Sequence, residues 1–159
     1  KSLKEKISGK IFNSSSHTLL IDRQFILVKP ILGYVEKEEF IIKKTSDFSK
    51  AFPKLKAETL SKYAISKDAK IALLDCNKLK FPLTLRRWKH GDKFMPLGMT
   101  GFKKLSDFLI GNKVPLFDKH NTFVLCNGND DIIWVVGRRI DERYKIETST
   151  KKVLKLIAK

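Results

Sequence analysis

The segment from Lys78 to Lys119 holds the side chains whose chemistry is easiest to interpret in this sequence. It contains ten Lys and Arg but only three Asp, a net charge of +7. The whole chain has 33 Lys and Arg against 17 Asp and Glu, a formal net charge of +16. An excess of this size indicates a polyanionic partner, for which nucleic acid is the first candidate and an anionic membrane surface the second.

Two lysines in this segment occupy positions that a helix does not favour. Apolar residues recur at helical spacing between Phe102 and Leu109, which predicts a short helix over residues 103–111. Lys103 and Lys104 would then fall in the first turn, where acidic residues are preferred. They are either two solvated lysines or, together with the free N–H groups of a helix start, a seat for a phosphate. The local charge density favours the phosphate seat.

Arginines near predicted strand ends complete the candidate surface. Arg86 and Arg87 alternate along a predicted strand, so we expect one to face RNA and the other to pair with an acid. Further arginines follow a strand that ends at Gly137, with Asp141 and Glu142 as expected partners. For each arginine, a salt bridge that orders a loop is an equal alternative. The predicted RNA-binding residues are Arg86, Arg87, Lys89, Lys93, Lys103, Lys104, Lys113, Arg138, Arg139 and Arg143.

Aromatic and acidic side chains lie among these basic residues. Trp88, Phe94 and Phe102 could stack on unpaired bases, although we expect Phe102 in the core because it shares the apolar face of the helix. Asp92 is expected to accept hydrogen bonds from backbone N–H groups of its turn. Asp107 is expected to position a lysine or an arginine.

No catalytic constellation is visible in the sequence. His17, His90 and His120 are scattered, and no His or Cys spacing suits zinc, so we predict neither a catalytic residue nor a metal site. Cys76 and Cys126 lie far apart, which favours small buried side chains in a reducing cytoplasm over a disulfide scaffold. No apolar run has the length of a membrane span, and no signal peptide opens the chain. Because the chain begins without an initiator methionine, we expect a piece of a longer protein.

The hydrophobic patterning predicts an α+β fold dominated by antiparallel strands, sandwich-like in its C-terminal domain, with one short helix packed on the sheet. Strand patterns recur at short intervals beyond residue 70, and Asn127-Gly128 between two apolar runs is the strongest hairpin signal. We predict a C-terminal domain over residues 71–159. Residues 1–70 would be a small β-rich element, either a linker or the end of a preceding domain, with a short helix over residues 54–63.

Two motifs of the C-terminal half point to a family. The first comprises Pro82-Leu83, Arg86-Arg87, Gly91-Asp92, Pro96-Leu97-Gly98-Met99, Lys103-Lys104-Leu105-Ser106-Asp107-Phe108 and Lys113-Val114-Pro115, and the second runs from Trp134 to Arg143. Together, in this order, they closely resemble the C-terminal domain of tRNA(Ile)-lysidine synthetase, the TilS family. The resemblance covers residues 71–157.

The resemblance implies a fragment of a ligase. The family's chemistry belongs to an N-terminal ATP-pyrophosphatase domain with a Ser-Gly-Gly-x-Asp-Ser loop, which this sequence lacks. The parent enzyme uses ATP to activate the wobble cytidine of CAU-anticodon isoleucine tRNA and attaches lysine to it, forming lysidine. ATP and Mg²⁺ would bind in that missing domain, so the resemblance implies no cofactor and no activity for the fragment alone. The C-terminal domain is associated with the tRNA acceptor stem and is similar in fold to a domain of the phenylalanyl-tRNA synthetase β-subunit.

The expected partners are therefore isoleucine tRNA and the enzyme's own N-terminal domain, with a homodimer as a further arrangement. Two other interpretations stay open. A generic RNA-binding or ribosome-associated module would bind any duplex RNA with similar affinity. A docking domain would instead contact the catalytic half or a second subunit, and charge reversal at Lys103 and Lys104 would then leave tRNA affinity unchanged.

Overall fold

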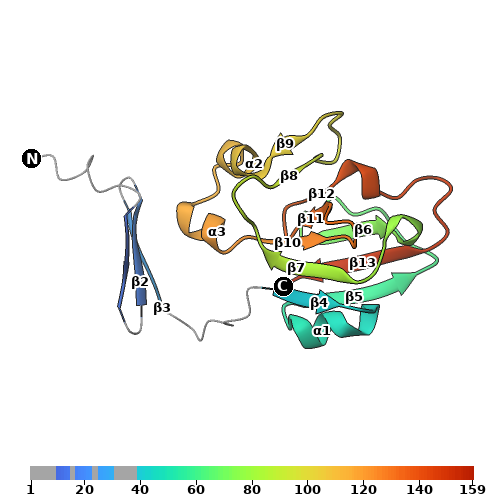
Figure 1. Cartoon of the computed structure of the whole chain (residues 1–159), viewed down its shortest axis with the longest axis horizontal. Helices are drawn as coiled ribbons and strands as arrows, with labels where there is room; N and C mark the ends of the chain where they lie inside the picture. Colours follow the sequence, from blue (N-terminus) through green and yellow to red (C-terminus); the bar gives the residue numbers. More distant parts are fainter. Residues whose placement is uncertain (1–9, 15–16, 23–24, 31–38) are drawn as a thin grey trace, which may run out of the picture.

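The computed structural model of the chain describes residues 10–14, 17–22, 25–30 and 39–159, and antiparallel β-sheets dominate it (Figure 1). A three-stranded sheet near the N-terminus has the order β1-β2-β3, with β1 Ile11–Asn13, β2 His17–Asp22 and β3 Phe25–Pro30. β2 pairs antiparallel with β3 over its whole length, which confirms the predicted β-rich character of the N-terminal element.

Two larger sheets form a sandwich in the rest of the chain. The five-stranded sheet has the order β12-β11-β10-β7-β4, and the facing sheet has the order β5-β13-β6. The strands of the first are β4 Glu39–Ile42, β7 Leu83–Arg87, β10 Phe123–Cys126, β11 Ile132–Val135 and β12 Arg139–Ile140. Those of the second are β5 Leu55–Leu60, β6 Ile71–Asp75 and β13 Val153–Ala158.

Helices are few and short. They are α1 Phe48–Ala51, α2 Leu105–Gly111 and α3 Leu116–His120, with 3-10 turns at η1 Thr45–Asp47, η2 Cys76–Lys78 and η3 Glu142–Tyr144. The predicted α+β, mainly antiparallel fold is thus confirmed, but beyond residue 70 the chain has two short α-helices, α2 and α3, where one was expected. None of these helices has both the length and the apolar character that crossing a bilayer requires.

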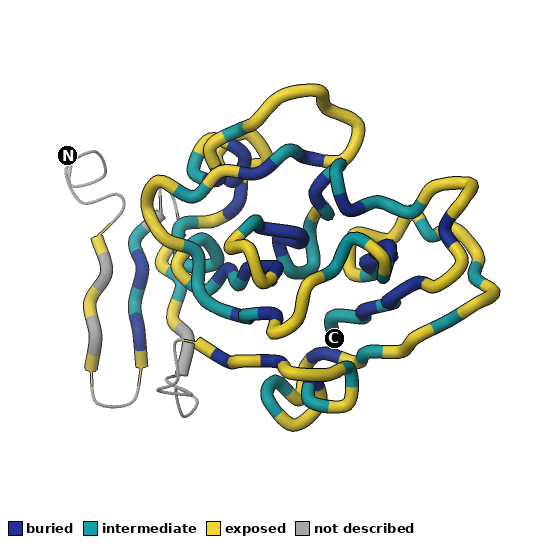
Figure 2. The backbone as a smooth tube through the Cα atoms, turned by 45° about the vertical axis from the view of Figure 1, so that its right-hand side comes forward, coloured by how far each residue is buried: buried dark blue, intermediate teal, exposed yellow. Residues whose placement is uncertain are grey.

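The central strands β10 and β11 of the five-stranded sheet are buried on both faces, and along β10 successive side chains alternate between two cores. Leu125 of β10 packs in the sandwich core with Leu85, Trp134 and Leu156. The neighbours of Leu125 in β10 point the opposite way, into a second core under α2. That second core contains Phe94, Leu105, Phe108, Leu109, Val114, Val124, Cys126, Ile132 and Val135. Figure 2 shows the buried residues gathered in these strands, whereas residues 97–102, in the loop at the top of the view, are exposed.

The helix predicted over residues 54–63 is wrong, because most of that segment forms β5. All six residues of β5 pair with β13, from Leu55 opposite Ala158 to Leu60 opposite Val153. Leu55 is fully buried and packs in the sandwich core, while the next residue, Lys56, is exposed. The side chains therefore follow the period of a strand, and pairing with β13 outweighs the weak helical pattern.

The domain division near residue 70 stays a prediction, but the hydrogen bonding limits where a division can fall. β4 pairs with β7, and β5 pairs with β13, so strands from both sides of residue 70 share each sheet of the sandwich. Phe40, Ile42 and Leu55 belong to the same core as Leu85. Residues 39–60 are therefore structurally part of the C-terminal sandwich rather than of the N-terminal element.

Candidate nucleic-acid interface

A two-stranded ribbon holds two cations next to each other. It consists of β8 Lys93–Phe94 and β9 Lys103–Lys104, with Lys93 opposite Lys104 and Phe94 opposite Lys103. Phe94 is fully buried, so Lys93 and Lys104 project from the other, exposed face. Like charges directly opposite in a ribbon are unfavourable. Neither lysine forms an ion pair with any carboxylate of the described residues, so the ribbon itself does not neutralise them.

Phe102 is the exposed aromatic residue beside this ribbon. Its side chain is 54% exposed, and its ring centroid lies 5.5 Å from Lys93 Nζ and 4.9 Å from Arg143 Cζ. Cations at these distances are attracted to the ring. The prediction that Phe102 packs in the core is wrong, because the helix begins only at Leu105 and Phe102 lies outside its apolar face. We call Lys93, Phe102, Lys104 and Arg143 the cationic ribbon.

The other two aromatic candidates have internal roles. Phe94 is fully buried and packs edge-on against Phe108, with ring centroids 5.0 Å apart. Trp88 is half-buried, and its Nε1 donates a hydrogen bond to the Lys119 carbonyl at 2.5 Å. The fully buried ring of Phe94 therefore has no surface on which a base could stack.

The phosphate seat predicted at the helix start does not form as expected. Lys103 and Lys104 belong to β9 rather than to the first helical turn, and the first helical N–H, that of Leu105, donates to the Asp92 carbonyl at 2.8 Å. Lys103 Nζ lies 3.8 Å from the point that a β-carbon on Gly111 would occupy, near the C-terminal end of α2. A cation there is stabilised by the helix dipole. Lys103 therefore lies near the C-terminal end of α2, whereas Lys104 lies on the exposed face of the ribbon, opposite Lys93.

Arg86 holds the turn that leads into β8. Its Nη1 and Nη2 donate to the two carboxylate oxygens of Asp92, each at 2.9 Å, and Asp92 Oδ2 also accepts from the Lys89 N–H at 2.8 Å. The hydrogen bond to Asp92 is the main cause that raises the pKa of Arg86. Two predictions are confirmed: one of the paired arginines contacts an acid, and Asp92 accepts from its own turn. This pair positions the exposed Lys89.

Arg87 also makes contacts inside the protein. Its Nη1 donates to the His120 carbonyl at 2.8 Å and to Asn121 Oδ1 at 2.9 Å, and its Cζ lies 5.3 Å from the Phe123 ring centroid. These contacts connect β7 to the end of α3. A loop-ordering role, the stated alternative to RNA binding, therefore describes both Arg86 and Arg87.

Arg143 is held by two carboxylates. Asp141 is fully buried and accepts from Arg143 Nε at 3.0 Å and from Nη2 at 3.1 Å, while Arg143 Nη1 donates to Asp131 Oδ2 at 3.0 Å. The hydrogen bond to Asp141 is the main cause that raises the pKa of Arg143. The expected pairing with Asp141 is confirmed. Asp131 was not predicted as a partner of Arg143, because no pattern in the sequence indicates that these residues, twelve positions apart, are close in space.

Glu142 pairs with a lysine rather than with an arginine. Its carboxylate accepts from the Gly98 N–H at 2.7 Å and from Lys145 Nζ. These two contacts, Gly98 first, hold the pKa of Glu142 below its ordinary value. Glu142 therefore fastens the loop between β8 and β9 to η3, and keeps Phe102 at one end of that loop near Arg143.

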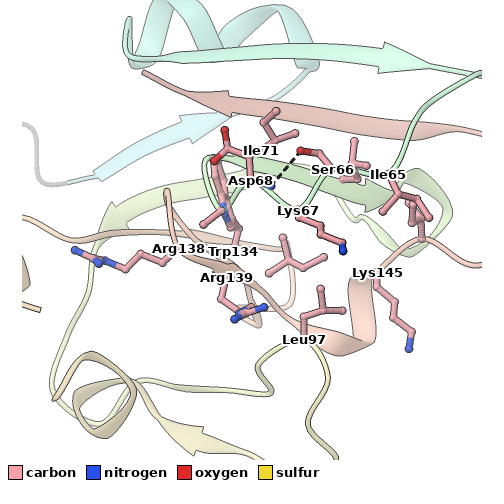
Figure 3. Close-up of a pocket in the computed structure, with 14 residues that line it drawn as sticks. Ile65, Ser66, Lys67, Asp68, Ile71, Leu97, Trp134, Arg138, Arg139 and Lys145 are labelled. Carbon is pink, nitrogen blue, oxygen red and sulfur yellow. Dashed lines mark hydrogen bonds between the residues drawn. The ribbon is translucent and has the colours of Figure 1, made fainter. Parts of the chain in front are cut away.

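The remaining candidates lie at separate places. Arg138 and Arg139 follow β11 and line a cavity together with Trp134 (Figure 3). Lys113 is exposed just beyond α2, in a left-handed conformation with φ of 52°. The prediction for Asp107 is wrong, since its carboxylate accepts from Ser106 Oγ at 3.3 Å and forms no ion pair with a described cation. The structure thus gathers Lys93, Lys104 and Arg143 around Phe102 and leaves the other candidates outside this group.

Metal-binding and catalytic groups were not expected. The described segments contain no group of three or more His, Cys, Asp or Glu side chains suited to a metal ion. The chemistry that the interface offers is the electrostatic binding of an anion by the exposed ammonium groups of Lys93 and Lys104.

Comparisons with known proteins show what this chain is similar to. The family model described as the TilS substrate C-terminal domain matches residues 83–156. The chain is 43% identical over 152 residues to the tRNA(Ile)-lysidine synthase of Parabacteroides distasonis, covering 94% of this chain and 34% of that protein. It is 33% identical over 148 residues to the tRNA(Ile)-lysidine synthase of Bacteroides thetaiotaomicron, covering 92% of this chain and 32% of that protein. The chain therefore spans about a third of the length of these curated relatives.

Two solved structures share the fold. A crystal structure of a TilS C-terminal domain superposes with a TM-score of 0.59 at 20% identity, covering 65% of this chain and 80% of that one. An N-terminal fragment of the phenylalanyl-tRNA synthetase β-subunit from Pyrococcus horikoshii gives a TM-score of 0.50 at 18% identity, covering 71% and 32%. The fold and both expected resemblances are confirmed, and the resemblance to the TilS substrate C-terminal domain extends over residues 83–156 of this chain.

Proposed function

We propose that this chain is the tRNA-binding C-terminal part of a tRNA(Ile)-lysidine synthase, and that its cationic ribbon contacts phosphates of the tRNA acceptor stem. The observation that carries the proposal is the placement of Lys93 directly opposite Lys104 on an exposed face, without carboxylate partners among the described residues. Two facing ammonium groups destabilise an isolated ribbon. A bound phosphate backbone removes that repulsion.

The surroundings of these lysines suit a nucleic-acid backbone. Phe102 lies beside Lys93 and Arg143, and the bonds of Arg143 to Asp141 and Asp131 fix its guanidinium before any ligand binds. RNA duplexes are recognised mainly through phosphates, 2′-hydroxyls and shape, for which cations on a rigid frame are suited. Both relatives are tRNA(Ile)-lysidine synthases, and we therefore take tRNA as the partner in this proposal.

Catalysis lies elsewhere in this proposal. The chain spans about a third of the relatives' length, and the ligation of lysine to the wobble cytidine, with ATP and Mg²⁺, is assigned to the remainder. The chain alone is then an RNA-binding part without ligase activity. Its task is to hold the tRNA while the catalytic part of the enzyme, a second expected partner, acts on the anticodon.

Fluorescence anisotropy with labelled CAU-anticodon isoleucine tRNA tests the proposal. If about four to six phosphates are contacted, the logarithm of affinity falls with the logarithm of salt at a slope of roughly −3 to −5. The double variant Lys93→Glu, Lys104→Glu should bind more weakly and lower the magnitude of this slope by roughly 1.4–1.8. The matched control is Lys50→Glu, Lys56→Glu, two exposed lysines on α1 and β5, which Figure 1 places on the opposite side from β8 and β9.

The outcomes separate the proposal from its alternatives. A tRNA affinity that is insensitive to salt, or unchanged in the ribbon variant, would contradict the proposal and favour a docking domain. Equal affinity for the tRNA and for an unrelated RNA duplex of the same length as the acceptor stem would favour a generic RNA-binding module. A loss of affinity in the ribbon variant, but not in the control, supports the ribbon as the contact surface.

A further inference from the structure

A cavity of about 520 Å³ has no role in the function proposed above. It lies between residues 65–73, β12 and the loop that joins β8 to β9, as Figure 3 shows. Leu97 forms part of its wall, and Phe102 stands at the end of the same loop, beside the ribbon. Its volume falls within the range of sites that bind small organic ligands, about 300–1,000 Å³. The loop between β8 and β9 thus contributes both to the wall of this cavity and to the cationic ribbon.

Trp134 lines the cavity with an unused hydrogen-bond donor. The residue is fully buried, and its Nε1 is a buried side-chain nitrogen without a hydrogen-bond partner in the described structure. Buried indole N–H groups usually find an acceptor, because leaving one unsatisfied is unfavourable. An acceptor atom on a bound ligand would satisfy this N–H. A carbonyl or ring nitrogen on a flat, otherwise apolar group fits the indole and its apolar neighbours.

The charged residues around the cavity are mostly cations. Lys67, Arg138, Arg139 and Lys145 line it, against the single carboxylate of Asp68. Lys145 is bonded to a neighbouring glutamate, whereas Arg138, Arg139 and Lys67 form no ion pair within the described residues. Figure 3 shows these cations on more than one side of the space. The lining thus combines apolar contact area with an excess of positive charge.

We propose that this cavity binds an unpaired nucleotide of the bound tRNA, an inference that rests on the function proposed above. The base packs among Trp134, Leu97 and Ile140 and accepts a hydrogen bond from Trp134 Nε1, while its phosphate lies at Arg138 and Arg139. Proteins read RNA bases most readily where the strand is single and the bases can leave the stack. The unpaired 3′ end adjoins the acceptor stem, so it is the part of the tRNA that reaches the cavity from the ribbon.

A hairpin RNA that reproduces the acceptor stem, with or without its unpaired 3′ nucleotides, tests this inference on the whole 159-residue chain. We expect the overhang to tighten binding about tenfold, the effect of one well-packed base. Trp134→Phe keeps the ring but removes the N–H donor. It should bind the overhang hairpin more weakly and leave the flush-hairpin affinity unchanged, although the urea-unfolding midpoint falls because a fully buried core side chain becomes smaller. Arg138→Gln with Arg139→Gln provides a second variant, and Lys50→Gln is the control.

Each outcome decides a specific point. Equal affinity of the wild-type chain for the two hairpins overturns the cavity inference but leaves the ribbon proposal intact. Failure to bind either hairpin contradicts the proposed function itself. Adenosine or cytidine monophosphate alone is the third probe: if it quenches tryptophan fluorescence in the wild type while the overhang adds nothing, the cavity takes a free nucleotide, and the assignment to the tRNA end is overturned. Loss of the overhang advantage in both variants, but not in the control, supports it.

Discussion

Replacing the buried carboxylate of Asp141 by an amide should destabilise the sandwich strongly. Asp141 is fully buried and accepts four hydrogen bonds: from the Met95 N–H at 2.8 Å, the Arg143 N–H at 2.9 Å, Arg143 Nε at 3.0 Å and Arg143 Nη2 at 3.1 Å. Asp141→Asn keeps the size of the side chain. However, it removes the charge and turns an amide donor toward other donors.

The magnitude follows from these contacts. Hydrogen bonds to charged groups contribute about 1.5–3 kcal/mol each, and removing one partner of a buried ion pair costs about 3–5 kcal/mol. Arg143 keeps its bond to Asp131 at 3.0 Å, and its side chain is 31% exposed, so solvent compensates part of the loss. We therefore expect the free energy of unfolding to fall by about 2–4 kcal/mol. For a chain of this size the melting temperature should drop by roughly 5–15 °C.

Urea unfolding followed by tryptophan fluorescence measures this effect. The control is Asp107→Asn, the same chemical change at an exposed carboxylate that accepts a hydrogen bond from Ser106 Oγ at 3.3 Å. We expect the control to change stability by less than about 0.5 kcal/mol. If Asp141→Asn also stays within that limit, the reasoning is refuted, because the carboxylate would then not be what holds the Met95 loop and Arg143 together.

Two further predictions concern pH and backbone packing. The Gly98 N–H and Lys145 hold the pKa of Glu142 below its ordinary value of 4.5, so the stability that this group contributes is complete above about pH 4.5 and is lost as the pH falls through the folded-state pKa. Glu142→Gln should therefore reduce the loss of stability at acidic pH in a plot of unfolding free energy against pH. An unchanged loss at acidic pH would contradict this assignment. At Gly128 a β-carbon would lie 2.6 Å from the Lys80 carbonyl oxygen, so Gly128→Ala should cost about 1–3 kcal/mol in the same unfolding assay. Gly101→Ala, which meets no atom within 4 Å, is the matched control, and equal stability of the two variants would show that the backbone moves aside.

Short-range patterns in the sequence were sufficient for much of this protein. Short apolar runs located β2, β3, β6, β10, β11 and β13, and Asn127-Gly128 marked the hairpin between β10 and β11. Partners close in the sequence were predictable in part: an acidic partner was expected for one of Arg86 and Arg87, though not Asp92 by name, and Asp141 was expected as a partner of the later arginines. These features depend on residues a few positions apart, whose separation the backbone geometry itself limits. The two family motifs likewise identified the fold that the comparisons confirm.

Tertiary structure alone decided the rest of the site. β5 is a strand because β13 offers it a complete set of backbone partners, and Phe102 is exposed because the helix starts three residues after it. Lys93 faces Lys104 because two strands ten residues apart in the sequence pair in one particular register, and a shift by one residue would reverse every side chain. Asp131 reaches Arg143, and Leu97 reaches the cavity of Trp134, only after distant segments pack. Such contacts arise from packing between elements, which local propensity and spacing do not encode.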